Sequence, residues 1–340
     1  MGKVAKNTKK YINNNSLGSS SSKSNANTNG NTVFKFNTDL GQHILKNPLI
    51  AQAIVDKAEL KPSDTVLEIG PGTGNLTMKI LQCNIKKLIC IEYDPRMASE
   101  LLKRIKLENP VFLQQNRVEI IIADFAKVDM DLLKNVDVCI SNTPYQISSI
   151  ITFKLLSILP KPPRTSVLMF QREFALRLVA KPGEALYSRL SCNVQLYAHT
   201  KHVMKVDKNN FKPPPKVESS IIKLEPKIKQ MQLGQLPPMD QFDGLLRIAF
   251  NRKNKTLSSN FNNKNVIELL KKNYIIGKSV SNSNGDSNMN IDDISYDFVK
   301  ELVLRILKEC EMEDKRAQKL SELDFLKLLL KFMENGIYFS

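Results

Sequence analysis

The chain has 340 residues, of which 42% are hydrophobic, and a formal net charge of +16. This length is enough for one large core and one smaller one, and we expect neither a membrane span nor a signal peptide because no apolar run has the required length or position. A positive field of this size favours a polyanionic partner, most simply nucleic acid, over a merely lysine-rich solvated surface.

The five cysteines are scattered and form no C-x-x-C pair; they are Cys83, Cys90, Cys139, Cys192 and Cys310. This usage favours reduced, mostly buried thiols in an intracellular protein. The three histidines lie near no cysteine cluster. We therefore expect no metal site.

Residues 1–32 are rich in Asn, Ser, Gly and Lys and are predicted to be disordered, because they hold few large apolar side chains. From residue 33 to 232, short apolar runs alternate with helical patterns, which predicts an α/β fold with a mainly parallel sheet covered on both faces. The expected strands are Thr65–Ile69, Leu88–Glu92, Val118–Ala123, Val136–Ser141, Thr165–Phe170, Val194–Ala198 and Ser219–Leu224. The expected helices are Leu76–Gln82, Pro95–Leu107, Ile150–Leu159 and Glu173–Val179.

Residues 233–340 are predicted to form a smaller helical domain, interrupted by a low-complexity insert at residues 278–291. Its expected helices are Phe242–Phe250, Val266–Asn273, Tyr296–Leu307 and Leu323–Phe332. Between Leu245 and Lys278, Glu268 is the single acid beside eight basic residues: Arg247, Arg252, Lys253, Lys255, Lys264, Lys271, Lys272 and Lys278. A merely soluble surface mixes the signs more evenly, so we expect this domain to bind RNA.

A glycine-rich turn, with Gly70, Gly72 and Gly74, follows the first expected strand of the sheet. Glycines at this place allow a ligand to approach backbone N–H groups at a helix start. Glu92 and Asp124 end the next two strands, where carboxylates can bind the ribose hydroxyls and the adenine amino group of a nucleoside. The G-x-G-x-G spacing, with an acid two positions earlier, resembles motif I of S-adenosylmethionine-dependent methyltransferases more than a dinucleotide fingerprint. S-adenosylmethionine is therefore the expected cofactor.

The string Asn142-Thr143-Pro144-Tyr145 follows the fourth strand, at the same sheet edge. An adenine amino group is a poor nucleophile because its lone pair is delocalised into the ring. The Asn142 oxygen and a backbone carbonyl near Thr143 can accept its hydrogens, Pro144 stiffens the turn, and Tyr145 offers a stacking face to an extruded base. A sulfonium donor is already electrophilic, so positioning suffices. Alone, the string is typical of an ordinary proline turn; beside the glycine turn and the strand-end acids it indicates methyl transfer to adenine N6.

These motifs resemble the ribosomal RNA adenine dimethyltransferases, the KsgA-like proteins and their eukaryotic nucleolar counterparts. The resemblance runs from about Phe36 to Ser340 and includes, besides the two motifs, the segments LGQHIL (40–45), MFQREFA (169–175), NNFKPPPKVESS (209–220), RKNKTL (252–257) and GIYFS (336–340). Thr143 is a departure, since the eukaryotic branch usually has leucine there. The position mainly contributes backbone, so we expect activity to survive.

The resemblance implies a Rossmann-like class I methyltransferase sheet with a smaller C-terminal helical domain. It implies dimethylation at N6 of two adjacent adenosines in the 3′-terminal hairpin of small-subunit (18S) rRNA. It also implies a role in the assembly of that subunit, on a pre-ribosomal particle in the nucleolus of the nucleus. A monomer is expected. The cofactor contacts that it implies are His43, Leu45, Gly70, Glu92, Asp124 and Asn142.

Further positions carry weaker predictions. His43 is otherwise typical of a capping or packing histidine. Phe170 or Phe174 can stack on the far face of the target base or belong to the core. Phosphate contacts or a solvated face are the alternatives for four basic residues, Arg172, Arg252, Lys253 and Lys255.

Two other functions compete with rRNA dimethylation. One is an RNA-binding assembly factor in which methylation is dispensable. The other is methylation of another target, such as adenine in DNA or a glutamine side chain. The basic helical tail favours a folded RNA over these targets.

Overall fold

The computed structural model describes Lys10, Tyr11 and residues 43–158, 161–232, 234, 236–282 and 294–339. Most of the predicted tail, the first three residues of the LGQHIL segment and the later part of the predicted insert lie outside this range. The described chain forms two compact units. Among the described residues, the sheet unit contains those up to Ala175 together with Lys201–Pro226, and the helical unit contains Leu176–Thr200 and those from Lys227 onward.

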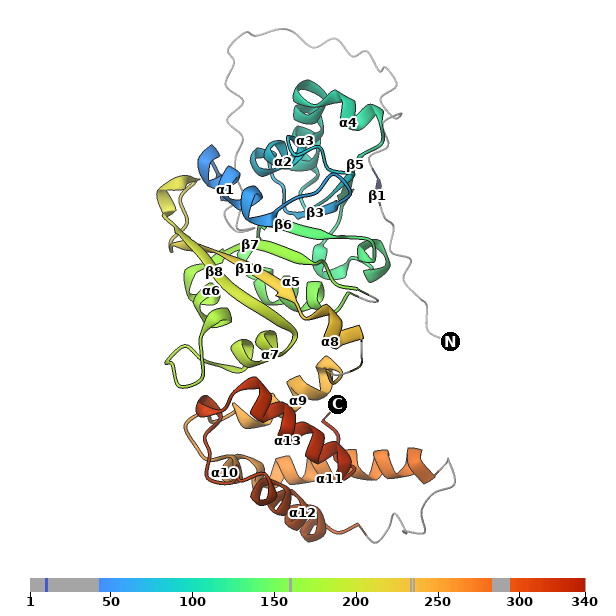
Figure 1. The fold of residues 1–340 in the computed structure, drawn as a ribbon, viewed down its shortest axis with the longest axis vertical. Coiled ribbons are helices and arrows are strands. Elements are labelled where there is room, and N and C mark those ends of the chain that lie inside the picture. Colours follow the sequence, from blue (N-terminus) through green and yellow to red (C-terminus); the bar gives the residue numbers. More distant parts are fainter. Residues whose placement is uncertain are drawn as a thin grey trace. The chain divides into compact units, whose positions relative to one another are not determined.

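The sheet has eight strands in the order β1-β5-β4-β3-β6-β7-β10-β8 (Figure 1). Their bounds are Lys10–Tyr11 (β1), Thr65–Ile69 (β3), Lys87–Glu92 (β4), Val118–Ile122 (β5), Val138–Asn142 (β6), Thr165–Gln171 (β7), Ala198–Val206 (β8) and Ser219–Pro226 (β10). The central strands from β5 to β7 are parallel, while β10 pairs antiparallel with β7 and β1 with β5. The predicted α/β fold with a mainly parallel sheet is confirmed.

Helices pack on the sheet, and α2 to α5 lie in the connections between its parallel strands. Their bounds are Pro48–Ala58 (α1), Asn75–Leu81 (α2), Pro95–Glu108 (α3), Pro110–Gln114 (α4), Ser148–Leu156 (α5) and Arg172–Val179 (α6). Helix α1 packs against α2 and over β6, β7 and β10, and α3 packs over β4 and β5. One face of α3 is apolar and buried; it consists of Met97, Leu101, Leu102 and Ile105. This spacing is that of an amphipathic helix with one face on the core.

Two predictions of local structure are wrong. The run Val194–Ala198 was expected to be a strand, but the structure has α7 over Arg189–Tyr197, and β8 begins only at Ala198. A capping box at Ser188 starts this helix, and a short apolar run does not distinguish a strand from a buried helical segment. Within the predicted disordered tail, Lys10–Tyr11 pairs with β5, whose outer edge offers unpaired backbone groups.

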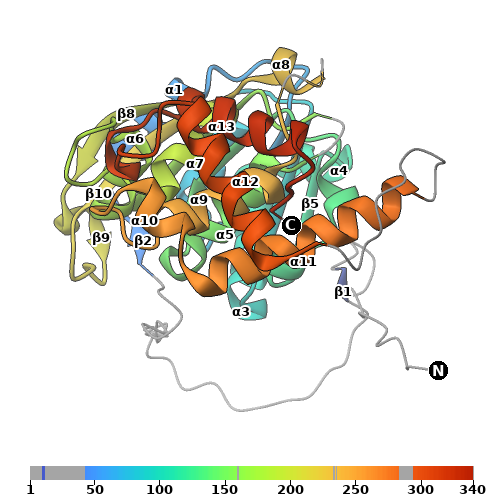
Figure 2. The same ribbon diagram turned by 90° about the horizontal axis from the view of Figure 1, so that it is seen from below.

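The helical unit is built from α7 and six further helices, with Ile228–Gln232 (α8), Met239–Ala249 (α9), Leu257–Phe261 (α10), Lys264–Asn282 (α11), Tyr296–Glu309 (α12) and Glu322–Glu334 (α13) in the described range. Helices α11 and α12 lie side by side (Figure 1 and Figure 2). Aromatic rings pack in its core beside aliphatic side chains, as in the stacked pair Phe261 and Phe332, whose centroids are 5.5 Å apart. Because α11 continues to Asn282, the first part of the predicted insert is helical.

Helix α7 packs against α9 and α13, and the Tyr187 hydroxyl donates a hydrogen bond to the Leu320 carbonyl (2.8 Å). The predicted boundary near residue 233 placed Leu176–Thr200 in the sheet domain, but in the structure these residues pack in the helical unit. In the part of the chain that the structure describes, no helix is both long enough and apolar enough to cross a membrane.

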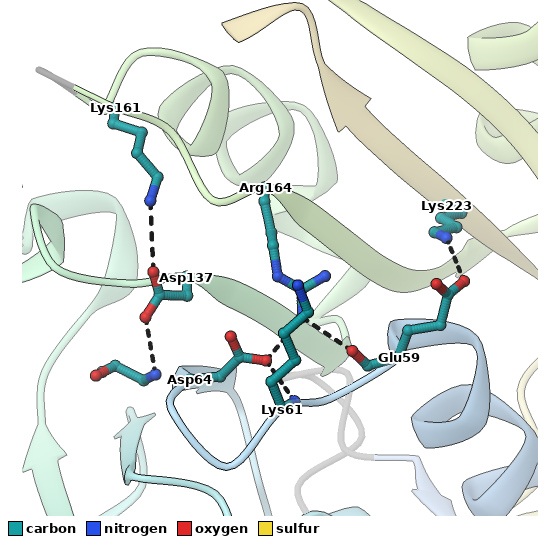
Figure 3. Close-up of polar contacts among 8 residues, drawn as sticks. Glu59, Lys61, Asp64, Asp137, Lys161, Arg164 and Lys223 are labelled. Carbon is teal, nitrogen blue, oxygen red and sulfur yellow. Dashed lines mark hydrogen bonds and ion pairs between the residues drawn. The ribbon is translucent and has the colours of Figure 1, made fainter.

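A network of ion pairs and hydrogen bonds joins the amino ends of the central strands (Figure 3). Arg164, directly before β7, donates to the Asp64 carboxylate (2.7 Å) and to the Glu59 carbonyl (2.9 Å). Asp137, before β6, accepts from the Thr65 backbone N–H (3.0 Å). The side chain of Asp64 is only 5% exposed, so Arg164 compensates a nearly buried charge.

Arg164→Ala is expected to destabilise the sheet unit by about 3 kcal/mol, because it leaves the Asp64 charge unpaired inside the protein. Urea denaturation followed by circular dichroism measures the change. Lys161→Ala is the matched control, since the Lys161–Asp137 pair (3.5 Å) is more exposed and its loss is expected to cost less than about 1 kcal/mol. Equal losses in the two variants would contradict the assignment.

Candidate active site

A cavity of about 320 Å³ lies at the carboxyl ends of β3, β4, β5 and β6, the edge where parallel α/β sheets bind ligands. Every residue that lines it belongs to the sheet unit. All the predicted cofactor and catalytic residues are among them: His43, Leu45, Gly70, Gly72, Glu92, Asp124, Asn142, Pro144 and Tyr145. The structure thus brings together residues that are as much as 102 positions apart (145 − 43).

The glycine turn lies directly against the N-x-P-Y string. Gly70 has φ +65°, and a Cβ atom built on it would lie 3.3 Å from Pro144 Cγ. Gly74 has φ +88°, and its Cβ would lie 2.7 Å from Leu101 Cδ1. A side chain at either position would strain the backbone, and at Gly74 it would also clash with α3. The absence of a side chain at Gly70 therefore lets the two motifs share one wall of the pocket.

Glu92, at the end of β4, presents a nearly buried carboxylate to the pocket, with 7% of the residue exposed. Burial raises the pKa of this carboxyl, and hydrogen bonds from the backbone N–H groups of Asp94 (2.9 Å) and Gly72 (3.0 Å) oppose the rise. These bonds fix both carboxylate oxygens. Asp124 likewise accepts from the Ala126 N–H (3.0 Å), which orients it at the end of β5.

Glu68 is a second carboxyl in the pocket wall, and it is 1% exposed. Burial raises its pKa to about 8, and the nearby Glu92 charge adds to the rise. The hydroxyl of Thr77 donates to it (2.7 Å), which opposes the rise. The carboxyl is therefore largely protonated at neutral pH.

Glu68→Gln is expected to make the stability of the folded protein less dependent on pH. The wild-type carboxyl has a pKa of about 8 when folded against an ordinary value of 4.5, so its stabilising contribution is full below pH 4.5 and is lost as the pH rises through 8. The slope in that window is up to about 1.4 kcal/mol per pH unit. Urea denaturation of both proteins between about pH 5 and pH 8 measures it. Identical slopes would show that Glu68 does not titrate in this way.

A two-stranded ribbon supports another wall, to which its β2 strand contributes, and orients Asn142. It pairs β2 (Ile44–Leu45) with β9 (Phe211–Lys212). The ring nitrogen Nδ1 of His43 lies 2.9 Å from the Pro213 carbonyl oxygen. Asn142 Nδ2 donates to the His43 carbonyl (3.0 Å). Because the group facing a carbonyl must be a donor, the Asn142 oxygen is left as an acceptor.

Tyr145 is anchored by its hydroxyl, which lies 2.6 Å from Ser219 Oγ on β10. Burial raises the pKa of the Tyr145 phenol to about 12, so the ring is neutral over the ordinary pH range. Thr143 is buried, and both its N–H (3.2 Å) and its hydroxyl (2.6 Å) donate to the Met169 carbonyl. The threonine hydroxyl is thus satisfied inside the protein.

The predicted substrate contacts lie outside the pocket lining. Phe170 is fully buried, with its ring centroid 4.9 Å from that of the partly exposed Phe174. Of the two alternatives given for Phe170, its burial agrees with the core position, whereas stacking of Phe174 on a base stays a prediction. Arg172 is half exposed and pairs with Glu218 (3.5 Å).

The remaining three basic candidates belong to the helical unit, on an exposed turn between α9 and α10. Arg252 donates to the Ser259 carbonyl (2.5 Å), and Lys253 to the Ala185 carbonyl (3.4 Å). Lys255 is exposed. Their contact with phosphate stays a prediction.

Sequence reasoning missed several pocket residues. Asn75 and Tyr93 line the cavity, and Ser219 holds Tyr145 from outside it. Asn75 and Tyr93 each lie next to a motif residue, and this adjacency was the available signal. Ser219 lies in the NNFKPPPKVESS segment, whose contacts are long-range. Within the described residues, no group of three or more His, Cys, Asp or Glu side chains could hold a metal ion.

Comparison with known proteins identifies the family of the chain. The family model for ribosomal RNA adenine dimethylase matches residues 33–300. A dimethyladenosine transferase from Saccharomyces cerevisiae is 51% identical over 340 residues, covering 100% of both chains. One from Schizosaccharomyces pombe is 50% identical over 313 residues, covering 91% of this chain and 94% of the relative.

Two solved structures are also similar to this chain. A dimethyladenosine transferase from Plasmodium falciparum is 42% identical, with a TM-score of 0.75 and coverage of 88% of this chain and 100% of that one. The 23S rRNA methyltransferase ErmE, at 21% identity and a TM-score of 0.56, shares the fold over 84% of this chain and 98% of its own. The chain therefore belongs to the ribosomal RNA adenine dimethylase family and is an rRNA adenine dimethyltransferase.

Proposed function

We propose that the chain uses S-adenosylmethionine to dimethylate N6 of two adjacent adenosines in the 3′-terminal hairpin of 18S rRNA. We further propose that it does so on a pre-ribosomal particle in the nucleolus, as part of small-subunit assembly. The observation that carries the chemistry is that Gly70 and Pro144 line one pocket and lie so close that a Cβ atom on Gly70 would be 3.3 Å from the proline ring, which brings the glycine turn and the N-x-P-Y string together.

The pocket fits an adenosyl cofactor. Gly72 has no atom within 4 Å of where its Cβ would be, so a ligand can approach its backbone. The Glu92 carboxylate suits a pair of ribose hydroxyls, and Asp124 suits an adenine amino group. Met97 and Phe125 add apolar surface to the lining. When bound, S-adenosylmethionine supplies a methyl group on a positively charged sulfur.

The protein's own residues prepare the acceptor nitrogen. The Asn142 oxygen, fixed by the bond from Nδ2 to the His43 carbonyl, accepts one amino hydrogen of the target adenine. The Thr143 carbonyl is the proposed second acceptor. The Tyr145 ring, held through Ser219, stacks on the base. Each round forms an N–CH₃ bond, breaks an S–CH₃ bond and releases one proton from the nitrogen, and two rounds complete each adenosine.

A methylation assay with labelled methyl donor tests the proposal. The wild-type protein is incubated with small-subunit pre-ribosomal particles, naked 18S rRNA or DNA, and the label is located by nuclease digestion and mass spectrometry. We expect dimethyladenosine at two adjacent positions of the 3′-terminal hairpin. Label on DNA or protein without label on 18S rRNA would overturn the proposed substrate.

The proposed place of action has its own test. A fluorescent fusion of the full chain is expected to accumulate in the nucleolus and to co-sediment with small-subunit precursors. A fusion that stays outside the nucleus would overturn this part and leave the chemistry untouched. If Asn142→Ala cells assemble subunits normally, methylation is dispensable for assembly, which is the alternative assembly-factor role.

A further inference from the structure

The side chain of Asn75, the first residue of α2, ties together two walls of the pocket. Its Nδ2 donates to the Leu45 carbonyl in β2 (2.7 Å). Its Oδ1 accepts from Arg104 Nη1 (2.6 Å), and the same nitrogen donates to the Thr73 carbonyl of the glycine turn (3.1 Å). Arg104 Nε is itself held by Glu108 (2.7 Å). Helix α3 thus clamps both the glycine turn and, through Asn75, strand β2.

Strand β2 has two edges, and the side chains of Asn75 and Asn142 both bind to the same edge. Lys46 donates its backbone N–H to the Asn210 carbonyl, so the edge of the strand that carries the Lys46 N–H faces β9. In an extended strand, backbone groups two residues apart point the same way. The carbonyls of His43 and Leu45 therefore share the other edge, where the amides of Asn142 (3.0 Å) and Asn75 (2.7 Å) satisfy them.

We propose that Asn75, held by Arg104, is a positioning residue for methyl transfer: it fixes β2 so that the His43 carbonyl keeps the Asn142 oxygen turned toward the target nitrogen. This inference rests on the proposed role of Asn142. It assigns a function to a residue that touches neither reacting atom in the proposed chemistry. The coupling runs through a single short strand, with His43 and Leu45 two residues apart.

Asn75→Asp is the sharpest variant. It keeps the size of the side chain and the oxygen that faces Arg104, but it replaces the donor facing the Leu45 carbonyl by a second acceptor. Two acceptors repel, so β2 loses this anchor. We expect kcat to fall about 10- to 100-fold, the effect of a misplacement of about 1 Å. The KM for the methyl donor is expected to change much less, because Glu92 and the glycine turn remain.

The test measures kcat and KM of the full-length wild type, Asn75→Asp, Arg104→Ala and Lys103→Ala on the 18S hairpin RNA. Arg104→Ala is expected to lower kcat in the same direction. Lys103→Ala is the control on the same helix, since its exposed pair with Glu100 (2.7 Å) touches neither wall, and it is expected to keep wild-type kcat. A double variant, Asn75→Asp with Asn142→Ala, is expected to be no slower than Asn142→Ala alone.

The outcomes separate the claims. Wild-type kcat in Asn75→Asp, a change in KM alone, or a further loss in the double variant would overturn the positioning role. Thermal unfolding of each variant identifies a folding defect, and an Asn75→Asp protein that loses activity only because it is unfolded also counts against the proposal. A wild-type protein that fails to methylate the hairpin overturns the proposed substrate instead, and the same comparison is then made on whichever nucleic acid the wild type labels.

Discussion

Asn142→Ala is expected to lower the rate of methyl transfer by about 100-fold or more, the loss typical of removing one preorganised polar contact to the reacting group. Two effects combine. The oxygen that accepts an amino hydrogen is gone, and the His43 carbonyl loses its partner at 3.0 Å. Single-turnover assays with saturating RNA and methyl donor measure the chemical step directly.

Asn142→Asp is the companion variant. It retains an acceptor oxygen but turns the donor that faces the His43 carbonyl into a repelling oxygen. We expect a rate between those of the wild type and Asn142→Ala. Binding of S-adenosylhomocysteine, measured by calorimetry, should weaken far less than the rate falls. An Asn142→Ala enzyme within a few-fold of the wild-type rate would remove this residue from the chemistry.

Glu92→Ala is expected to weaken binding of the methyl donor by about 100-fold, equivalent to about 3 kcal/mol, because two hydrogen bonds to a charged acceptor are lost. The carboxylate also organises its surroundings, since it accepts from Gly72 (3.0 Å) and Asp94 (2.9 Å). Its loss should therefore loosen the glycine turn as well. Isothermal calorimetry with S-adenosylmethionine and S-adenosylhomocysteine measures the affinity.

Glu119→Ala provides the control for Glu92→Ala. Glu119 lies on the neighbouring strand β5, pairs with Lys87 at 2.7 Å and is partly exposed outside the pocket lining. Its removal should leave affinity unchanged. Similar losses in the two variants would mean that charge on the sheet, and not the contact at Glu92, governs binding. A Glu92→Ala protein with wild-type affinity would displace the cofactor from the proposed seat.

The central sheet was predictable because its strands leave a strong local signal. Thr65–Ile69 is a strand with the predicted bounds, and β4 begins at Lys87, one residue before the prediction. Buried parallel strands read as short apolar runs that end at glycine or acidic residues. The same logic located Glu92 and Asn142, since residues at the carboxyl ends of parallel strands meet at one edge.

What sequence could not supply were contacts between distant segments without periodicity. The pairing of His43 with Pro213 spans 170 positions, and that of Tyr145 with Ser219 spans 74. None of these segments has a periodic pattern from which the segment that it contacts could be predicted. The family resemblance marked the 209–220 segment as characteristic, and the structure gives the physical reason: it holds one pocket wall and the predicted stacking ring. The two alternatives for Phe170 stayed open for a related reason, because burial of an aromatic side chain depends on tertiary packing.

The division of the chain has a consequence for synthesis. Helix α7 leaves the ribosome well before α9 and α13, the helices against which it packs. Until α13 has emerged, the apolar face of α7 with Leu196 and Tyr197 lacks part of its cover, and an exposed face of this kind invites aggregation. A protein truncated after Pro226 would keep α7 permanently in that state. To express the two units separately, residues 176–200 must be removed from the sheet unit and joined to the helical unit. A single truncation point therefore cannot separate the two units of this enzyme.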